Sequence, residues 1–158
     1  MLIDSKRPFL LISAFLALSL SGIIIYQQYL KFVEKNTLTI YTGAGTVKIR
    51  VKYAITPEEQ QEGLMNQSSL NKKSGMIFVF PEERNRGFWM KNVLIPLDVV
   101  FISSNGKINE ITTLNLCSEE PCTVYNSKNP SKYVIEVNAG SIAKWKILEG
   151  DILEIKGF

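Results

Sequence analysis

The segment Thr46–Tyr53 alternates strictly between apolar and polar residues. Its valine, isoleucine and tyrosine side chains would share one face of a strand, and its lysine and arginine side chains would share the other. We therefore expect a strand with one buried face and one solvated face. Leu38–Tyr41 predicts an earlier strand, which the turn Gly43-Ala44-Gly45 would join to it.

A short helix is predicted to follow this pair of strands. Thr56 is a suitable N-cap, Pro57 fits the first helical position, and Glu59 completes a capping box. Gly63 would end the helix within two turns. The next segment, Met76–Phe80, is apolar throughout, which is typical of a strand buried on both faces.

Short strands account for most of the remaining pattern. They are predicted over Phe88–Val93, Leu97–Ile102, Lys107–Thr113, Lys132–Val137 and Asp151–Lys156. Asn105-Gly106 is typical of a two-residue hairpin turn, and a second short helix is expected from Ser141 to Ile147. Pro81–Arg86 and Leu114–Ser131 are expected to be loops. The many short strands and two short helices predict a mainly β fold, either a β-sandwich or a partly closed barrel.

An uncharged apolar segment, Phe9–Tyr26, precedes all of these elements. As a helix it would be near the lower limit for crossing about 30 Å of hydrocarbon. A cleaved signal peptide is the alternative, because Ser19 and Ser21 offer small residues at a plausible cleavage site. The apolar run continues past that site, so we expect an uncleaved transmembrane helix.

Basic residues flank both ends of this segment, so the charge bias that orients a membrane helix is small. We expect the N-terminus to lie inside and the rest of the chain to be exported. The chain then divides into an N-terminal membrane anchor with its flanks, residues 1–35, and a mainly β domain, residues 36–158. The domain would be extracytoplasmic, in a periplasmic, lumenal or extracellular location, and held to the membrane by one pass.

Cys117 and Cys122 are the only cysteines. An even number of cysteines in an exported domain favours a disulfide, and the Glu-Pro pair between them favours a turn. Free thiols, a redox pair and a metal site are the alternatives, although two thiols without histidine make a poor metal site. Because the closed ring is short, we expect the bond to hold one loop rather than the whole fold.

Composition narrows the chemistry further. The 158 residues carry 18 Lys+Arg and 15 Asp+Glu, and their content of 46% hydrophobic and 21% charged residues excludes a disordered chain. Several of the basic residues precede residue 36, so the domain itself is nearly neutral, which excludes the basic surface of a nucleic-acid binder. The absence of histidine excludes a serine triad and zinc sites that use imidazole. We expect neither a metal nor a cofactor.

Large apolar side chains in the predicted strands are assigned to the core. Phe78, Phe80, Trp89 and Phe101 could instead form a platform for carbohydrate, but packing is the simpler interpretation of their strand spacing. The methionines are likewise assigned to packing rather than to a Cu(I) site.

Five stretches of the domain stand out as a series. They are Gly63-Leu64-Met65, Gly75–Phe80, Trp89-Met90-Lys91-Asn92, Ile95–Phe101 and Glu136–Gly140, with Gly150-Asp151 after them. As a set they resemble the domain-of-unknown-function 192 family over roughly Thr46–Lys156. The resemblance implies a compact β-rich domain of a kind that is often exported. The family has no established activity, so the resemblance implies no catalytic residues. Where the family commonly has threonine after the Lys-Asn pair, this chain has Val93.

Three charged residues interrupt apolar strands, namely Lys91, Asp98 and Glu136. Because an unpaired buried charge is costly, we expect at least one carboxylate to pair with Lys91 and Asn92 to border the same pocket. The cluster would be a network that fixes strand register, the polar lining of a ligand cleft, or an acid–base site with shifted pKa values.

These observations favour a membrane-anchored binding or accessory domain. Its partner would be a small ligand, a peptide or another envelope protein, and not a nucleic acid. One alternative is an envelope enzyme, a hydrolase or lyase that uses Lys91, Asp98 and Glu136. Another is a structural subunit of a membrane complex, docked through the N-terminal helix. A polar cleft around Lys91 would favour binding or catalysis, whereas a flat exposed apolar patch would favour the structural role.

Overall fold

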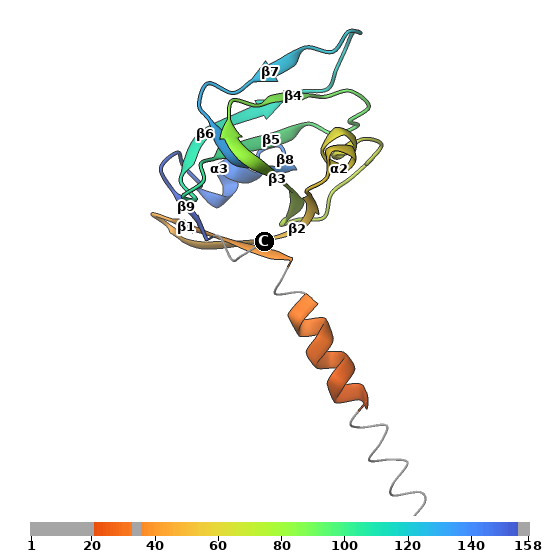
Figure 1. The fold of residues 1–158 in the computed structure, drawn as a ribbon, viewed down its shortest axis with the longest axis vertical. Coiled ribbons are helices and arrows are strands. Elements are labelled where there is room, and N and C mark those ends of the chain that lie inside the picture. Colours follow the sequence, from red (N-terminus) through yellow and green to blue (C-terminus); the bar gives the residue numbers. More distant parts are fainter. Residues whose placement is uncertain (1–20, 33–35, 155–158) are drawn as a thin grey trace, which may run out of the picture. The chain divides into compact units, whose positions relative to one another are not determined.

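A computed structural model describes residues 21–32 and 36–154 of the chain. The chain divides into two compact units, Met1–Lys35 and Asn36–Phe158. Residues 21–32 form a helix (Figure 1). The side chains of this helix are exposed. Most of the predicted membrane segment, Phe9–Tyr26, lies outside the described residues. Within the described part, no helix combines the length and the apolar character that a membrane crossing requires.

The second unit is built on a seven-stranded sheet with the order β6-β5-β8-β3-β2-β1-β9 (Figure 1). The strands of this sheet are β1 (Thr37–Thr42), β2 (Gly45–Ala54), β3 (Ser74–Arg84), β5 (Leu97–Ile102), β6 (Ile108–Leu114), β8 (Ser131–Asn138) and β9 (Ile152–Glu154). A separate two-stranded ribbon pairs β4 (Gly87–Trp89) with β7 (Val124–Asn126). The short helices are α2 (Pro57–Glu62) and α3 (Ser141–Trp145).

One pair of strands in this sheet is parallel. β2 and β3 run in the same direction, and the chain passes from one to the other through α2. The other neighbouring pairs are antiparallel. A parallel pair needs a crossover connection, so α2 and the loop after it must cross one face of the sheet, where Leu64 packs with Phe78.

The sheet curls until its two edge strands meet at one end. Lys107, directly before β6, forms a β-bridge with Ile152 of β9. The Ile108 amide donates to the Asp151 carbonyl at 2.9 Å, and the Leu153 amide donates to the Gly106 carbonyl at 2.8 Å. The mainly β class predicted from the sequence is confirmed, and its form is a curled half-barrel.

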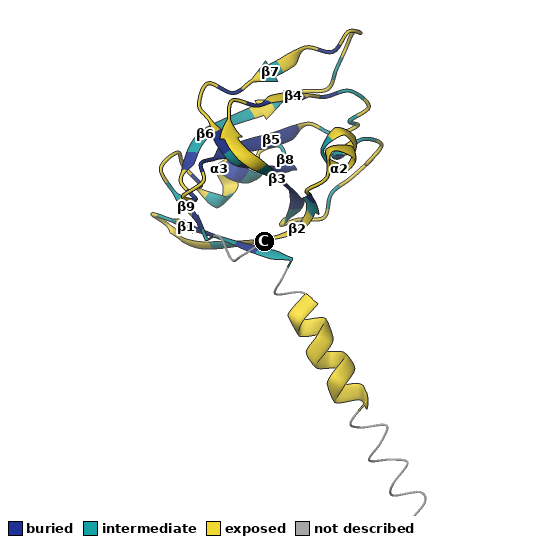
Figure 2. Cartoon of the chain, in the orientation of Figure 1, coloured by how far each residue is buried: buried dark blue, intermediate teal, exposed yellow. Residues whose placement is uncertain are grey.

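Alternation along the central strands produces two separate hydrophobic cores. Ile77 of β3 and Ile135 of β8 face the inside of the curl, where residues of the outer strands and α3 join them. Phe78 and Val134, the neighbours of those two residues, face the other side and pack with Phe88 of β4. Each face of β5 packs on one of these two cores, so the strand is buried along its whole length (Figure 2). The short helix α2, in contrast, is exposed.

The capping box predicted for the first short helix is confirmed in detail. Thr56 caps α2, and Glu59 completes the capping box by accepting from the Thr56 amide. The hairpin predicted at Asn105-Gly106 does join the antiparallel strands β5 and β6, but it is not a two-residue turn. The Gly106 amide donates to the Ser103 carbonyl at 3.0 Å, so Ser104 and Asn105 are the central residues, and neither has the positive φ of a primed turn. Gly106, with a φ of 86°, follows them in the left-handed region.

Three other predictions need correction. The strand predicted over Phe88–Val93 ends at Trp89, because Asn92 has a φ of 56° and turns the chain. β3 continues to Arg84 through the predicted charged loop. The predicted loop Leu114–Ser131 contains β7, which pairs with β4.

Candidate functional site

The two carboxylates of the predicted cluster lie on opposite faces of the sheet. Asp98 of β5 is opposite Val137 of β8, and Glu136 is opposite Val99. Because cross-strand partners share a face and successive residues alternate, Asp98 faces the inner core and Glu136 faces the outer one. The prediction that Asp98 and Glu136 belong to one polar cluster is therefore wrong.

Asp98 has a structural role. Its carboxylate accepts from the Thr113 hydroxyl at 2.7 Å and from the Ile142 amide at 3.0 Å. Ile142 lies in the first turn of α3, and the N-cap residue Gly140 supplies no side-chain hydrogen bond there. Asp98 of β5 therefore caps α3 from outside the helix. Its carboxylate accepts from an amide of the first turn that has no acceptor within the helix.

The other two predicted residues lie in the turn after β4. The Lys91 ammonium is 5.6 Å from the centroid of the Trp89 ring, and among the described residues it forms no ion pair with Asp98 or Glu136. Asn92 is exposed, and its carbonyl accepts from the Asn66 amide at 2.8 Å. Neither residue lines the cavity that contains Glu136. The four predicted residues thus do not form one cluster.

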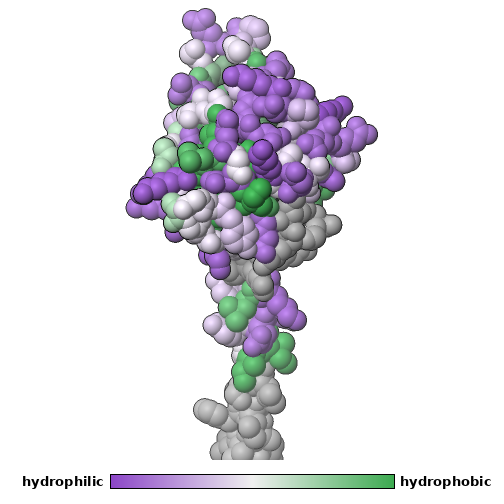
Figure 3. Space-filling model, turned by 90° about the vertical axis from the view of Figure 1, so that its left-hand side faces the viewer, coloured by the Kyte–Doolittle hydropathy of each residue, from purple (hydrophilic) through white to green (hydrophobic). Residues whose placement is uncertain are grey.

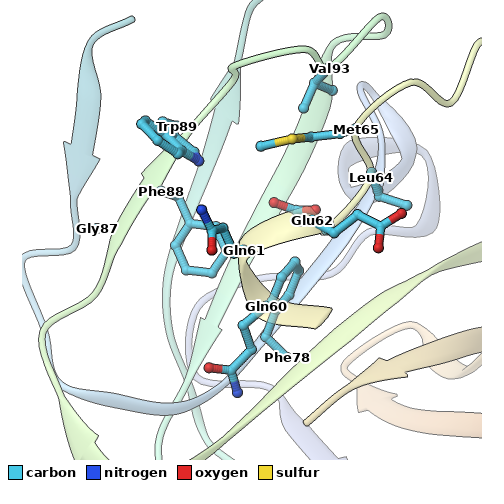
Figure 4. A pocket seen from close by; sticks show the side chains of 12 residues that line it. Gln60, Gln61, Glu62, Leu64, Met65, Phe78, Gly87, Phe88, Trp89 and Val93 are labelled. Atoms are coloured by element: carbon cyan, nitrogen blue, oxygen red, sulfur yellow. The ribbon is translucent and has the colours of Figure 1, made fainter. Parts of the chain in front are cut away.

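Glu136 itself lines a cavity of about 80 Å³, which we call the Glu136 cavity (Figure 4). The wall comes from α2 and the loop after it, from β3, and from β4 with the turn that follows. The lining residues are Gln60, Gln61, Glu62, Gly63, Leu64, Met65, Phe78, Gly87, Phe88, Trp89, Val93 and Glu136. A volume of this size is enough for several water molecules or for one small ligand group.

Two glycines allow close packing at Phe78 and Glu136, which line the cavity. Gly63 ends α2 with a φ of 50°, and a Cβ there would lie 3.3 Å from the Phe78 ring. A Cβ on Gly75 of β3 would lie 2.2 Å from the Glu136 carbonyl oxygen. Only glycine therefore allows β3 to approach β8 beside Glu136.

Aromatic rings form much of the wall. Phe78 and Phe88 meet edge to face with ring centroids 5.1 Å apart, and Phe88 meets Phe101 in the same way at 5.7 Å. Trp89, expected in the core, is 41% exposed. Figure 4 shows Trp89 with Met65 at one side of the cavity and Phe78 at the other. The exposed indole leaves an aromatic surface available to a ligand.

The carboxyl group of Glu136 is buried without a partner. The residue is 5% exposed, and no other described residue donates a hydrogen bond to it or pairs with it. In the described part of the chain, Ser131 Oγ is the one side-chain polar atom that is both fully enclosed and without a hydrogen-bond partner. The Glu136 carboxyl has no partner either, so it is not fully enclosed by protein and borders the cavity. Burial raises the pKa of Glu136 to about 8. At neutral pH the group is therefore mostly protonated and can donate as well as accept a hydrogen bond.

A larger cavity of about 550 Å³ lies beside residues 117–122, which we call the cysteine loop. Cys117 and Cys122 are at disulfide-bonding distance, with Cα atoms 5.5 Å apart. Met90 and residues of the loop line this cavity, and its two charged residues, Glu119 and Glu120, are exposed. Because its charged groups are already in water, this cavity is the weaker candidate for a specific site.

Sequence reasoning missed the contribution of α2 and of the turn after it. A signal was nevertheless present, because the stretches that carry the family resemblance meet at the Glu136 cavity. Its lining takes residues from four of those stretches, namely Gly63, Leu64, Met65, Phe78, Trp89 and Glu136.

Comparison with curated proteins gave no match. Among solved structures, a protein described as a "putative transcription regulator" from Sinorhizobium meliloti 1021 is 35% identical, with a TM-score of 0.70, and the match covers 75% of this chain and 91% of that one. A protein of unknown function from Novosphingobium aromaticivorans DSM 12444 is 31% identical, with a TM-score of 0.69 and coverage of 75% and 84%.

The profile of the family DUF192, described as "Uncharacterized ACR", matches residues 39–155. This match and the two solved structures agree with the resemblance carried by the five stretches. The chain belongs to the DUF192 family.

Proposed function

We propose that the domain is a binding module and that part of its ligand enters the Glu136 cavity. The observation that carries the proposal is the carboxyl of Glu136, which is buried, has no partner among the described residues and faces open space. Burying a polar group without a hydrogen bond destabilises the fold. A group of this kind in a cleft is a candidate for ligand recognition.

The size of the cavity limits what can enter. Sites for drug-sized ligands have volumes of about 300–1,000 Å³, whereas the Glu136 cavity holds about 80 Å³. The ligand part that fits is therefore a side chain or a small headgroup. Trp89, a partly exposed residue of the lining, would contact the part of the ligand that remains outside.

The face of the molecule in Figure 3 bears on the structural-subunit alternative. Apolar side chains on that face form small groups among hydrophilic ones. Scattered apolar side chains are normal for a protein surface and do not mark a docking patch. This face therefore gives no support to a purely structural role.

The exported, membrane-anchored location is part of the proposal. It is supported by the uncharged apolar segment Phe9–Tyr26 and by two cysteines at disulfide-bonding distance in the domain. In this location the module would meet small molecules, peptides or other envelope proteins outside the cytoplasm.

A fragment experiment tests the binding site. Neutral, anionic and cationic fragments of up to about four carbons, a size chosen for this cavity volume, are added to the ¹⁵N-labelled full chain. At least one class should shift the amide signals of Leu64 and Met65 and the indole signal of Trp89. Val93→Phe, which fills the cavity, should abolish the shifts, and Leu94→Phe, at an exposed neighbour outside the lining, should keep them. If no class shifts these signals, the proposed site is wrong.

One observation favours a second candidate function. Glu136 holds a proton near pH 7, as a general acid must, and Glu62 supplies a second carboxyl in the same lining. The enzyme hypothesis that also used Lys91 and Asp98 is not favoured, because neither residue lines the cavity. Turnover of a substrate with a rate that falls above about pH 8 would favour this acid–base enzyme over a binding module.

A further inference from the structure

We propose that the group entering the Glu136 cavity is a primary ammonium on an alkyl chain, either a free amine or the end of a lysine side chain. The inference rests on the proposed function and gives its ligand a chemical class. Three features of the lining support it: its charge, its aromatic faces and its hydrogen-bond acceptors.

The charge of the lining is one-sided. Two carboxyl groups, Glu136 and Glu62, belong to it, and none of the lining residues is lysine or arginine. In a partly enclosed site a cation next to an ionised carboxylate is attracted more strongly than in water. An anion would meet no positive residue in the lining itself and would be repelled by Glu62, while Lys91 lies outside the lining on the Trp89 ring.

The aromatic rings favour a cation over a neutral group. Phe78, Phe88 and Trp89 line the cavity, and the face of an aromatic ring attracts cations. Trp89 already interacts with one cation, because the Lys91 ammonium lies 5.6 Å from its ring centroid. A ligand ammonium in the cavity would use the same kind of interaction from the other residues of the wall.

Hydrogen bonding favours a primary ammonium over a quaternary one. A primary ammonium has three donors. Glu136 offers carboxyl oxygens at the cavity, and Glu62 and Gln61 offer further acceptor oxygens in the lining. A quaternary ammonium has no donor, so it would leave the Glu136 carboxyl without a partner.

Binding of an ammonium requires Glu136 to lose its proton. The proton goes to solvent, and the neutral carboxyl is replaced by a carboxylate paired with the ligand. On the elements packed against Glu136, the facing residues Met76 and Phe78 of β3 and Val99 of β5 do not titrate. Glu62 is the other titratable group of the lining, and Asp98 faces the opposite side of the sheet.

The proton release makes the affinity depend on pH. Since burial raises the pKa of Glu136 to about 8, the ionised fraction in the free protein rises with pH up to that value. The dissociation constant for an amine should therefore fall about ninefold between pH 6 and pH 7, and binding at pH 7 should release about 0.9 proton.

Tryptophan fluorescence of the full chain measures this binding. The chain has two tryptophans, and Trp145→Phe leaves Trp89 as the reporter while changing a residue that packs on the inner core. The probes are n-butylammonium, the neutral n-butanol and the anionic butyrate, at constant ionic strength. We expect n-butylammonium to bind most tightly, with the pH dependence given above, and calorimetry in buffers of different ionisation enthalpy to measure the released proton.

Variants identify the carboxylate responsible. Glu136→Gln should weaken n-butylammonium binding at pH 8 at least about tenfold, the scale of one charged hydrogen bond, and should remove the pH dependence. Glu58→Gln, on the exposed part of α2 and outside the lining, should change neither. The pH dependence in the Trp145→Phe background is a second test, which does not depend on the Glu136→Gln variant.

The outcomes separate the inference from the proposed function. Binding of n-butanol or butyrate as tight as that of n-butylammonium, or amine binding without pH dependence, overturns the ammonium inference and leaves the binding site in place. If no probe and no fragment binds at the cavity, both are wrong. A short peptide with blocked termini and one free lysine side chain identifies the source, because tighter binding than n-butylammonium indicates a peptide ligand and weaker binding a free amine. Either result supports the inference.

Discussion

At the scale of single residues, the buried carboxyl groups of this domain show how environment decides role. Glu110 and Glu136 are each 5% exposed. Glu110 accepts hydrogen bonds from the Tyr125 hydroxyl and from the amides of Lys128 and Asn129. Glu136 accepts none from the described residues and borders a cavity. Glu110 therefore holds the fold together, whereas Glu136 weakens it at neutral pH.

Glu136→Gln should stabilise the protein at neutral pH. In the unfolded chain Glu136 ionises near the ordinary glutamate value of 4.5, whereas the folded state keeps the proton up to a pKa of about 8. The folded state binds more protons in this window, so the free energy of unfolding falls as pH rises through it. Between pH 5 and pH 8 the loss should be roughly 3 kcal/mol, and Glu136→Gln should remove it. Urea unfolding of the wild type and of Glu136→Gln at pH 5 and pH 8 measures this loss of stability and its removal.

Glu110→Gln is the matched control, since it changes an equally buried carboxylate that has donors. It should destabilise the fold at pH 7 by about 1–3 kcal/mol, because the amides and the Tyr125 hydroxyl lose a charged acceptor. An equal response of the two variants would contradict the distinct roles given to Glu110 and Glu136.

At the scale of elements, distant side chains hold short segments in place. α3 has five residues, which is too short to be stable alone, and its N-terminus depends on Asp98 of β5. The cysteine loop is likewise tied at its ends by Cys117 and Cys122. Both segments should therefore loosen before the sheet does.

Asp98→Ala should release α3. The Ile142 amide and the Thr113 hydroxyl each lose an acceptor, which should lower the free energy of unfolding by about 1–3 kcal/mol. Relative to the wild type, Asp98→Ala should accelerate amide exchange at Ile142 and Ile147 more than at Ile135. Thr113→Val is the control, because it removes one bond to Asp98 and leaves the cap in place. Unchanged exchange at Ile142 would show that Asp98 does not cap α3.

Cys117→Ser should affect the cysteine loop alone. The closed ring is short, so the loss of stability should be at or below about 2–3 kcal/mol. We expect faster proteolysis within Leu114–Ser131 and an unchanged β-sheet signal in circular dichroism. Two free thiols in wild-type protein purified without reductant would contradict the bond.

The elements were largely predictable from the sequence, because local patterns determine them. The apolar run Met76–Phe80 identified a strand buried on both faces, and Thr56 with Glu59 identified the start of α2. The strand predicted through Lys91 was wrong because a left-handed residue, Asn92, interrupts it, and a left-handed residue other than glycine has no reliable sequence signal.

The candidate site was only partly predictable. Glu136 was identified as a charge in an apolar strand, which is a local property. Its partners depend on strand register and on the parallel crossover, which are long-range properties. A register in which Glu136 faces Val99 puts Asp98 on the other face, and no pattern within either strand states that register. The contribution of α2 was missed for the same reason.

At the scale of the whole molecule, the chain combines an N-terminal unit with a β domain built on one curled sheet. The domain is described from residue 36 to residue 154, while the anchor predicted over Phe9–Tyr26 lies mostly outside the described residues.

A reporter fused after Phe158 should be active only outside the cytoplasm. The uncharged segment, the basic residues before it and the cysteine pair after it all favour export. Alkaline phosphatase and a fluorescent protein that matures only in the cytoplasm give opposite readouts. Cytoplasmic activity of the fusion would contradict the orientation, and a shortened N-terminus in the mature protein would contradict the uncleaved anchor.

The pairing of β1 with β9 has a consequence for the order of biosynthesis. Ile40 lies beside Leu153, so the first strand of the domain lacks one neighbour until the last strand of the domain has been made. Contacts between residues so far apart in sequence form slowly, because a long loop must close first. A nascent chain from which β9 has not yet emerged therefore cannot complete this sheet. In an exported protein, the same delay would keep the chain open while a secretion channel threads it.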